Sequence, residues 1–423
     1  MQTLQKRTKR LFLGLILGLS CLIGCSSETV NKDDFENIEK PIYMDDSYEI
    51  NTDLLNVKTT TTDETSLYRV INNELVDVGK VNENIDLDMS DIIFSNCINI
   101  KDTDLYVNSD NLKLSDRWYE KRNNLIPYNQ NLQTTSMYSL YDFKGNLLFN
   151  INSQDDYPIY VLGDDINRYG ILFQNEILYI DSKDIINIYE NNNSNELIAK
   201  EIPVLMYHFF YSQENGETRV DGNYVEVNEF NEHLLTIKDE GFITLTMQEV
   251  LLFMEERAKL PEKSVVITID DGDPSVLKYA YPLIKEYKMN ATMFLITATE
   301  DPVLNYDYIM MREDGIELQS HSWLMHTGGC PNQGHGGRLQ CVDYETGVQD
   351  TKLSFDYVDG GFVYCYPFGD VNEHAKSIIK DGGAKLAFTT AYGKIKQGMD
   401  LLELPRIRVT GGNGISAFKK SIY

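Results

Sequence analysis

Histidine is scarce in this sequence, and its distribution is uneven. The 423 residues include six histidines, and none of them precedes residue 200. Histidine is the side chain that most often transfers protons and binds metals near neutral pH, so we expect such chemistry in the C-terminal part. The six are His208, His233, His321, His326, His335 and His374.

Positive charge is also in short supply. The chain has 38 Lys and Arg against 65 Asp and Glu, a formal net charge of −27. Four of the basic residues and no acidic ones fall in the first 24, so the charge without that segment is −31. Such a protein repels phosphate backbones and anionic lipid. We therefore expect no nucleic-acid partner, and neutral or cationic ligands are favoured.

Long apolar runs are missing too. The run at 11–23 is shorter than the roughly 20 apolar residues that cross a bilayer. It follows four basic residues at 6–10, which is typical of a secretion signal, and residues 22–25 resemble a bacterial lipoprotein cleavage site. We expect a signal peptide over 1–24 and a lipid anchor on Cys25, at the outer face of the bacterial cytoplasmic membrane or cell envelope. A signal peptide without lipidation is the alternative.

Few cysteines lie beyond the expected signal peptide and lipidation site, so few disulfides are possible there. No CxxC or zinc-finger spacing occurs. Export permits a disulfide between Cys330 and Cys341 across a Gly-rich loop, although two free thiols fit the sequence equally well. The other cysteines beyond residue 25 are Cys97 and Cys365.

The remaining chain divides into three parts. Residues 25–45 are polar and acidic and are interpreted as a tether. Residues 46–198 consist of short apolar runs separated by turn signals such as Asn72-Asn73 and Lys144-Gly145, which predicts a small all-β module. SH3-like units are one interpretation of it.

In the third part, residues 199–423, strands alternate with amphipathic helices. Thr246 and Glu249 form a capping box that opens a helix to about residue 259, and Pro274 starts another helix. This alternation predicts an α/β fold, a (β/α) barrel of seven or eight strands with room for distortion. The expected strands are 202–208, 242–245, 265–269, 291–296, 316–320, 362–366, 386–389 and 404–409.

One stretch organises this domain. The continuous apolar run 265–269 indicates a strand buried on both faces, and it leads directly into Asp270 and Asp271. Neighbouring side chains leave a strand on opposite sides, so one carboxylate can bind a metal while the other handles a proton. An ordinary strand-to-helix turn is the alternative.

Other reactive residues also follow predicted strands. His208, His321 and the segment Pro367-Phe368-Gly369 each come at a strand exit, and in a parallel barrel all exits face one mouth. His326 follows His321 by five residues, a spacing that pairs the two only where a strand runs into a loop. Together with Asp271 they make a two-His, one-carboxylate set typical of a catalytic Zn, Fe, Co or Ni. The alternative is one packed and one exposed histidine.

These motifs resemble the polysaccharide deacetylase family, carbohydrate esterase family 4, over about 202–423. The resemblance is carried by 268–272 for the Asp-Asp-Gly motif, by His321-Ser322 with His326, and by 366–369 for the Pro-aromatic-Gly motif. The usual family has a four-residue histidine spacing and an arginine at position 365. Both departures resemble the circularly permuted poly-N-acetylglucosamine deacetylases, whose leaving-group histidine comes early, as His208 does here.

The resemblance implies hydrolysis of acetamide groups on an N-acetylated polysaccharide with one divalent metal ion. It implies Asp271, His321 and His326 as metal ligands, Asp270 as the base, His208 as the acid and the Phe368 N–H as an oxyanion donor. Trp323, Pro367 and Phe368 are expected to bind substrate. The partner of Asp270 is left unidentified, because Cys365 replaces the arginine.

Two other interpretations stay open. A peptidoglycan N-acetylglucosamine deacetylase would use the same chemistry, and a non-catalytic glycan-binding lipoprotein could keep the fold. Intact Asp270, Asp271, His321 and His326 argue against the second. The other three histidines are left out of the chemistry, since two fall in predicted helices and His335 in a Gly-rich loop.

Overall fold

The computed structural model describes residues 51–115, 123–163, 167–191, 197–298, 308, 310–312, 314, 316–331 and 334–423. The expected signal peptide, the lipid anchor on Cys25 and the tether up to residue 45 lie outside the described residues. Within the described part of the chain, no helix has both the length and the apolar character to cross a membrane.

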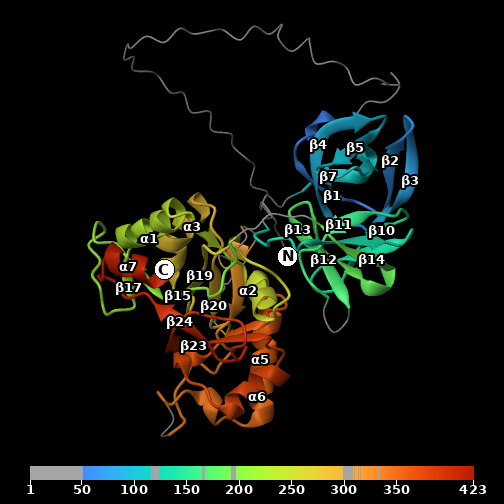
Figure 1. The fold of residues 1–423 in the computed structure, drawn as a ribbon. Helices are drawn as coiled ribbons and strands as arrows, with labels where there is room; N and C mark the ends of the chain where they lie inside the picture. The colour runs from blue at the N-terminus through green and yellow to red at the C-terminus, as the bar shows by residue number, and fades with distance from the viewer. Residues whose placement is uncertain are drawn as a thin grey trace, which may run out of the picture. The chain divides into compact units, whose positions relative to one another are not determined.

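The first part of the described chain is an all-β module, as expected (blue to green in Figure 1). Its larger sheet is antiparallel with the order β12-β13-β9-β10-β3-β2-β6-β5-β4-β1-β7, and a smaller sheet has the order β11-β8-β14. Whether it divides into SH3-like units stays a prediction. The strands are β1 Lys58–Thr61, β2 Thr65–Ile71, β3 Glu74–Val81, β4 Asp86–Phe94, β5 Cys97–Ile100, β6 Tyr106–Asn108, β7 Leu112–Leu114, β8 Gln130–Thr134, β9 Tyr138–Tyr141, β10 Leu147–Ile151, β11 Asp156–Pro158, β12 Arg168–Phe173, β13 Glu176–Asp181 and β14 Ile185–Glu190.

Turn residues fix the register of these strands. Asn72 and Asn73 have φ values of 52° and 66°, and they join β2 to β3 with Ile71 opposite Glu74. A two-residue hairpin loop of this kind needs positive φ at both positions, which Asn tolerates better than most residues. The strands then bury a core of alternating apolar side chains that includes Leu67, Ile98 and Phe149.

The second part is a parallel barrel. Strand β15 pairs with both β24 and β19, which closes a ring of seven strands in the order β15-β24-β23-β22-β21-β20-β19. The eighth strand, β18, pairs with β19 outside the ring. The strands are β15 Val204–Tyr207, β18 Ile243–Thr244, β19 Ser264–Ile269, β20 Thr292–Leu295, β21 Glu317–Ser320, β22 Val363–Cys365, β23 Leu386–Tyr392 and β24 Leu404–Arg408, and a separate parallel pair is formed by β16 Phe209–Tyr211 and β17 Tyr224–Glu226.

Every residue of β15, β19, β20 and β22 is buried. Strands covered on both faces favour apolar side chains, which is why these segments, apart from Ser264 at the start of β19, are apolar or β-branched runs. The helices that accompany the barrel are α1 Val227–Asp239, α2 Met247–Met254, α3 Tyr281–Glu286, α5 Tyr344–Tyr357, α6 Glu373–Asp381 and α7 Ile415–Ile422.

Two helices differ from the prediction. Helix α2 begins at the expected Thr246 capping box but ends at Met254, because Glu256 is left-handed with φ 60° and Lys259 pairs with Ile126 of the β module. The helix expected from Pro274 consists of a π-helical turn, Val276–Ala280, followed by α3. Pro282 near the start of α3 has no N–H to donate, so the regular α-helical bond to Lys278 cannot form there.

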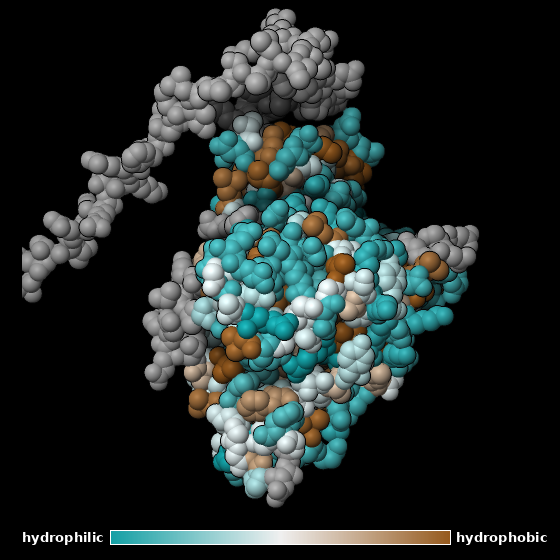
Figure 2. All heavy atoms as spheres, turned by 90° about the vertical axis from the view of Figure 1, so that its left-hand side faces the viewer, coloured by the Kyte–Doolittle hydropathy of each residue, from teal (hydrophilic) through white to brown (hydrophobic). Residues whose placement is uncertain are grey.

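The β module and the barrel share apolar contacts. One cluster of buried side chains contains Val161 and Tyr179 of the module together with Leu251 and Phe253 of α2. Next to it, the carboxylate of Glu249 accepts hydrogen bonds from the backbone and side-chain amides of Asn124. On the face shown in Figure 2, hydrophilic residues cover most of the described surface and hydrophobic ones occur in small groups.

Candidate active site

The parallel strands carry the reactive residues to one edge of the barrel. His208 follows β15, Asp270 and Asp271 follow β19, and His321 follows β21, each at the carboxyl end of its strand. All four line one cleft of about 270 Å³. Its full lining is His208, Phe209, Asn223, Asp270, Asp271, His321, His326, His335, Tyr366, Phe368, Gly369, Thr390 and Arg408.

Asp271, His321 and His326 are brought together as the sequence predicted. The Oδ1 atom of Asp271 lies 3.3 Å from His321 Nε2 and 3.4 Å from His326 Nε2. Ligands on a common ion about 2.1 Å away are roughly 3.0–3.4 Å apart in octahedral or tetrahedral geometry, so this set fits a small divalent cation. The set leaves coordination positions open, as a catalytic site requires.

The hydrogen bonds around these ligands also favour metal binding. His321 Nδ1 donates to the Cys365 carbonyl oxygen at 2.7 Å, which turns Nε2 toward Asp271, where a neutral imidazole would offer its lone pair to a cation. Burial by itself would raise the pKa of Asp271, but its bonds to His321 and His326 outweigh burial and hold the pKa well below the ordinary value. Asp271 is therefore a carboxylate at neutral pH, as a metal ligand must be.

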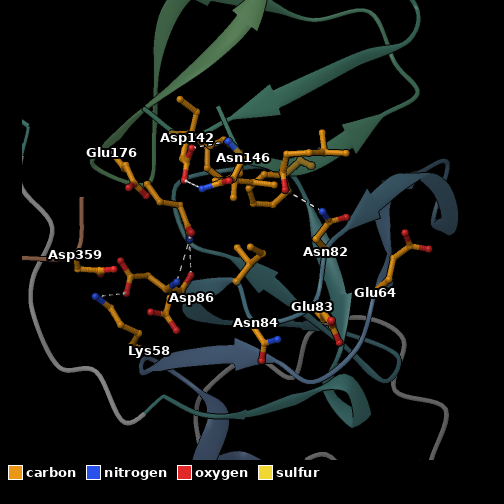
Figure 3. Close-up of a pocket in the computed structure, with 18 of the residues that line it drawn as sticks. Lys58, Glu64, Asn82, Glu83, Asn84, Asp86, Asp142, Asn146, Glu176 and Asp359 are labelled. Atoms are coloured by element: carbon orange, nitrogen blue, oxygen red, sulfur yellow. Dashed lines mark hydrogen bonds and ion pairs between the residues drawn. The ribbon is translucent and has the colours of Figure 1, made fainter. Parts of the chain in front are cut away.

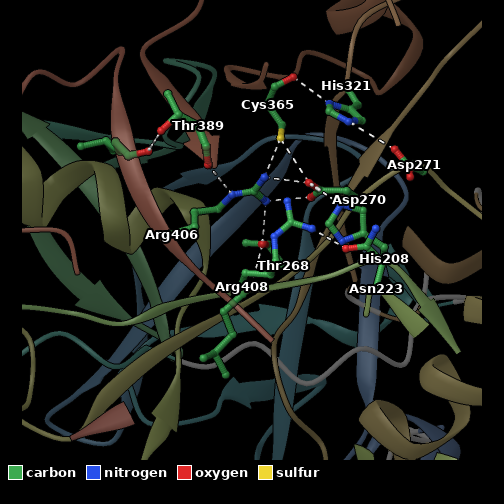
Figure 4. A network of polar contacts seen from close by, with 12 residues as sticks. His208, Asn223, Thr268, Asp270, Asp271, His321, Cys365, Thr389, Arg406 and Arg408 are labelled. Atoms are coloured by element: carbon green, nitrogen blue, oxygen red, sulfur yellow. Dashed lines mark hydrogen bonds and ion pairs between the residues drawn. The ribbon is translucent and has the colours of Figure 1, made fainter. Parts of the chain in front are cut away.

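Asp270 has a partner that the sequence analysis did not find. Arg406 of β24 forms a two-pronged ion pair with it, Nη1 to Oδ1 and Nη2 to Oδ2, each at 2.7 Å (Figure 4). Arg406 is fully buried, and it also donates to Thr268 Oγ1 and to the sulfur of Cys365. Burial by itself would raise the pKa of Asp270, but the guanidinium lowers that pKa to about 2.

This arginine occupies the role left open by Cys365. It reaches Asp270 from a different strand, past the smaller cysteine side chain, whose Sγ lies 3.5 Å from Asp270 Oδ2. A signal was present in the sequence, because an arginine between Leu404 and Ile407 interrupts a run otherwise expected to be buried. A buried charge of this kind requires an opposite charge beside it.

His208 lies over the same carboxylate. Its Nε2 is 3.8 Å from Asp270 Oδ2, and 14 % of its side chain is exposed. Burial lowers the pKa of His208, while the charges of Asp270 and Asp271 oppose that effect. The ring also contacts Phe209, which belongs to the parallel pair β16 and β17.

Strained backbone surrounds the cleft. Asp271, Ser322 and Phe368 have positive φ values of 74°, 81° and 63°, which are costly for residues with a side chain. At Phe368 the turn comes directly after β22, and the Phe368 N–H makes no hydrogen bond with any described residue. An N–H held at the cleft without a partner can donate to a developing oxyanion.

Comparison with known proteins agrees with this geometry. Residues 257–387 match the model of the polysaccharide deacetylase family. The chain is 30 % identical over 227 residues to YxkH of Bacillus subtilis, which its name places among polysaccharide deacetylases, and the match covers 52 % of this chain and 75 % of YxkH. The chain belongs to the polysaccharide deacetylase family. It is thus an enzyme of the polysaccharide N-deacetylase class.

Two further relatives of this deacetylase have more specific names. The poly-beta-1,6-N-acetyl-D-glucosamine N-deacetylase of Staphylococcus aureus is 28 % identical over 203 residues, which are 44 % of this chain and 69 % of that protein. The solved structure of the Streptococcus pyogenes deacetylase PplD in complex with acetate is 24 % identical with a TM-score of 0.46, covering 53 % of this chain and 98 % of PplD.

Two residues expected to bind substrate are not among those lining the cleft of the deacetylase. The Trp323 ring packs edge-on against Tyr357 at 5.9 Å, and its backbone N–H donates to Asp350. Pro367 is buried and starts the turn that presents Phe368. Its contribution is therefore to the shape of the backbone, whereas the Phe368 side chain does line the cleft and is 36 % exposed.

The histidines set aside in the sequence analysis have different fates. His233 is buried and stacks on Phe418, and His374 Nε2 bonds the Val342 carbonyl oxygen, so both are structural. His335, which was left out of the chemistry, is one of the residues that line the cleft. The hairpin that carries it holds the disulfide between Cys330 and Cys341, which is present with an S–S distance of 2.06 Å.

A larger cavity, of about 1010 Å³, lies mainly along the β module (Figure 3). Its lining is acidic and includes Glu64, Glu83, Asp86 and Asp142, with no histidine. Without a nucleophile, a proton-transfer pair or a metal set, this cavity does not offer the chemistry of the barrel cleft.

Proposed function

We propose that this protein removes N-acetyl groups from N-acetylglucosamine units of an extracellular polysaccharide similar to poly-N-acetylglucosamine, with one divalent cation held by Asp271, His321 and His326. The observation that carries this proposal is the placement of that ligand set beside the Asp270–Arg406 pair, with His208 facing the same carboxylate. The named Staphylococcus relative supports this substrate class.

A cation held by Asp271, His321 and His326 would supply Lewis acidity, which would polarise the acetyl carbonyl and make water easier to deprotonate. Asp270 accepts the proton of the attacking water. Arg406 keeps Asp270 ionised and fixes its orientation, but it also makes the carboxylate a weak base, with a pKa of about 2. A base this weak would act only on a water molecule that a neighbouring cation had made more acidic.

The other residues of the cleft complete the reaction. The Phe368 N–H donates to the oxyanion that develops on the acetyl carbonyl. His208, in its imidazolium form, protonates the departing amine, which is a poor leaving group until it is protonated. Asp270 Oδ2 and His208 Nε2 lie 3.8 Å apart, so both can reach groups on one tetrahedral centre.

The decisive experiment measures acetate release by the purified full-length protein in detergent, with metal analysis of the same preparation. Poly-N-acetylglucosamine, peptidoglycan glycan strands and chitooligosaccharides are compared. We expect about one divalent ion per chain and the fastest release from poly-N-acetylglucosamine. Fastest acetate release from peptidoglycan strands would instead favour a peptidoglycan N-acetylglucosamine deacetylase. Glycan binding without any acetate release would favour a non-catalytic glycan-binding lipoprotein.

We also propose a lipid anchor on Cys25 at the outer face of the bacterial membrane, supported by the residues around position 25. Mass spectrometry of the mature N-terminus should find diacylglycerol on this cysteine. A Cys25→Ala protein should be released by salt and alkaline washing. Retention of that variant in the membrane would contradict the anchor.

A further inference from the structure

A disulfide-linked hairpin contributes His335 to the lining of the cleft. It starts directly after the metal ligand candidate His326, with Arg338 N–H donating to the Thr327 carbonyl oxygen at 2.8 Å and Gly328 opposite Gly337. The disulfide between Cys330 and Cys341 closes it. Backbone pairing and a covalent link therefore hold the described part of this loop in a defined conformation.

Asp370 fixes the hairpin against the barrel. Its carboxylate is 6 % exposed and accepts bonds from the His335 backbone N–H at 2.8 Å, the Gly337 N–H at 2.9 Å and His335 Nδ1 at 3.0 Å. Asp370 directly follows the turn that contains Phe368. The residue that binds the hairpin is therefore next in sequence to the turn that presents the oxyanion donor. Gly334 is required there, because a Cβ would lie 2.2 Å from Asp370 Oδ1.

The bond to Asp370 also sets the orientation of the His335 ring. With Nδ1–H donated to the carboxylate, a neutral imidazole has its lone pair on Nε2. The side chain of His335 is 72 % exposed and lines the cleft, and Nε2 has no hydrogen-bond partner among the described residues. Asp370 thus fixes the Nδ1 edge of the ring, and the Nε2 edge is free to bind a ligand.

An oriented acceptor of this kind suits a hydroxyl-rich, uncharged ligand. The cleft lining also has a second polar pair, in which Arg408 donates to the side-chain oxygen of Asn223 (Figure 4). The cleft therefore has fixed polar groups outside the reacting centre itself. Sugar polymers are recognised through such groups, because each unit presents several hydroxyls in fixed directions.

We propose that His335 is a substrate-binding residue, whose Nε2 accepts a hydrogen bond from a hydroxyl of the polysaccharide in the cleft, and that Asp370 is the residue that positions it. The identity of the ligand as a polysaccharide rests on the proposed function. His335 takes no part in the chemical step, since its contact is the same before and during the reaction.

Three variants of the full-length protein separate this role from a structural one. His335→Asn keeps a donor near the Nδ1 position for Asp370 but has no atom at the Nε2 position. His335→Gln places a polar atom near the Nε2 position, and His335→Ala removes both. Melting temperature and disulfide content are measured for each variant, so that loss of the hairpin is recognised directly.

With poly-N-acetylglucosamine oligomers, His335→Asn and His335→Ala should raise KM about 2- to 12-fold, the usual worth of one hydrogen bond, with kcat nearly unchanged. His335→Gln should recover part of the loss. A His335→Asn enzyme with wild-type KM would overturn the proposal and leave His335 with only the bond to Asp370. A fall in kcat with unchanged KM would also overturn it.

Binding of the same oligomers, measured by calorimetry, distinguishes failure of this inference from failure of the proposed function. If the wild-type protein binds the oligomers but releases no acetate, the proposed activity fails, and weaker binding by His335→Asn still supports the contact. If acetate is released and His335→Asn binds as tightly as wild type, the activity stands and the role of His335 is wrong.

Discussion

His208 Nε2 lies 3.8 Å from Asp270 Oδ2, so the proposed acid and the proposed base meet at one point of the cleft. We expect His208→Ala to keep its metal and its affinity for substrate but to lose about 10²–10⁴-fold in kcat, the usual worth of general acid catalysis. A histidine with only a packing role would instead lower the melting temperature and leave turnover nearly normal.

The same residue predicts a pH dependence. His208 must be protonated to act, so the wild-type rate should fall as pH rises through its pKa. Burial lowers that pKa, which shifts the fall toward lower pH than for an ordinary histidine. In His208→Ala this basic limb should flatten. Profiles of kcat against pH for both proteins test the assignment, and an unchanged limb would assign the ionisation to another group.

Metal binding and proton transfer should separate by mutation. His321→Ala should lose both metal and activity, because two remaining ligands bind weakly. Asp270→Asn should keep the metal and lose turnover, since Asp270 is paired with Arg406 and is not one of the proposed ligands. Elemental analysis and acetate release are measured on both variants. Full metal occupancy in His321→Ala would show that the ligands are misassigned.

Arg406→Met should destabilise the protein by about 3–5 kcal/mol at pH 7, because it leaves Asp270 buried without a counter-charge. The double variant Arg406→Met/Asp270→Leu should recover much of this loss. Folding lowers the pKa of Asp270 from about 3.9 in the unfolded chain to about 2. The ion pair therefore stabilises the folded state fully above about pH 3.9, and that stabilisation is lost as the pH falls through about 2. Urea unfolding at pH 7 and pH 3 measures the effect, and a single variant as stable as wild type would contradict it.

Glu317 predicts the opposite pH dependence. Burial raises its pKa to about 7, so its protonated form favours folding below about pH 4.3, and that stability is lost as pH rises through 7. Glu317→Gln keeps an acceptor for the Met247 N–H and the Thr292 hydroxyl. We expect a higher melting temperature than wild type at pH 8 and no gain at pH 4.5.

The control for this comparison is Glu83→Gln, which removes a negative charge from an exposed position. It corrects for the general relief of repulsion in a protein of charge −27. An equal gain in both variants at pH 8 would mean that burial of Glu317 is not the cause.

The strand exits could be predicted from sequence because the rule that places them is local. A buried parallel strand must be apolar, and a reactive residue directly after it must lie at the barrel mouth, as Asp271 and His321 do. The barrel closure that decides between seven and eight strands depends on the pairing of β15 with β19, and no local pattern encodes that pairing.

The positions that the sequence did not reveal are those whose roles arise from distant partners. Arg406 reaches Asp270 across 136 positions of sequence, and His335 is oriented by Asp370 across 35. In the same way helix α2 ends early because residues after it pair with the β module, a contact that outweighs helix propensity. Closeness in sequence can also mislead. Trp323 is two residues from His321, yet it is not among the residues that line the cleft.

The apolar cluster shared by the β module and α2 has a practical consequence for anyone who shortens this protein. Cutting at residue 199, where the sequence changes character, would strip Val161 and Tyr179 from Leu251 and Phe253 and leave Glu249 without Asn124. The truncated barrel would then present a hydrophobic patch prone to aggregation. Calorimetry of the intact protein should accordingly show the two parts melting in a single cooperative transition.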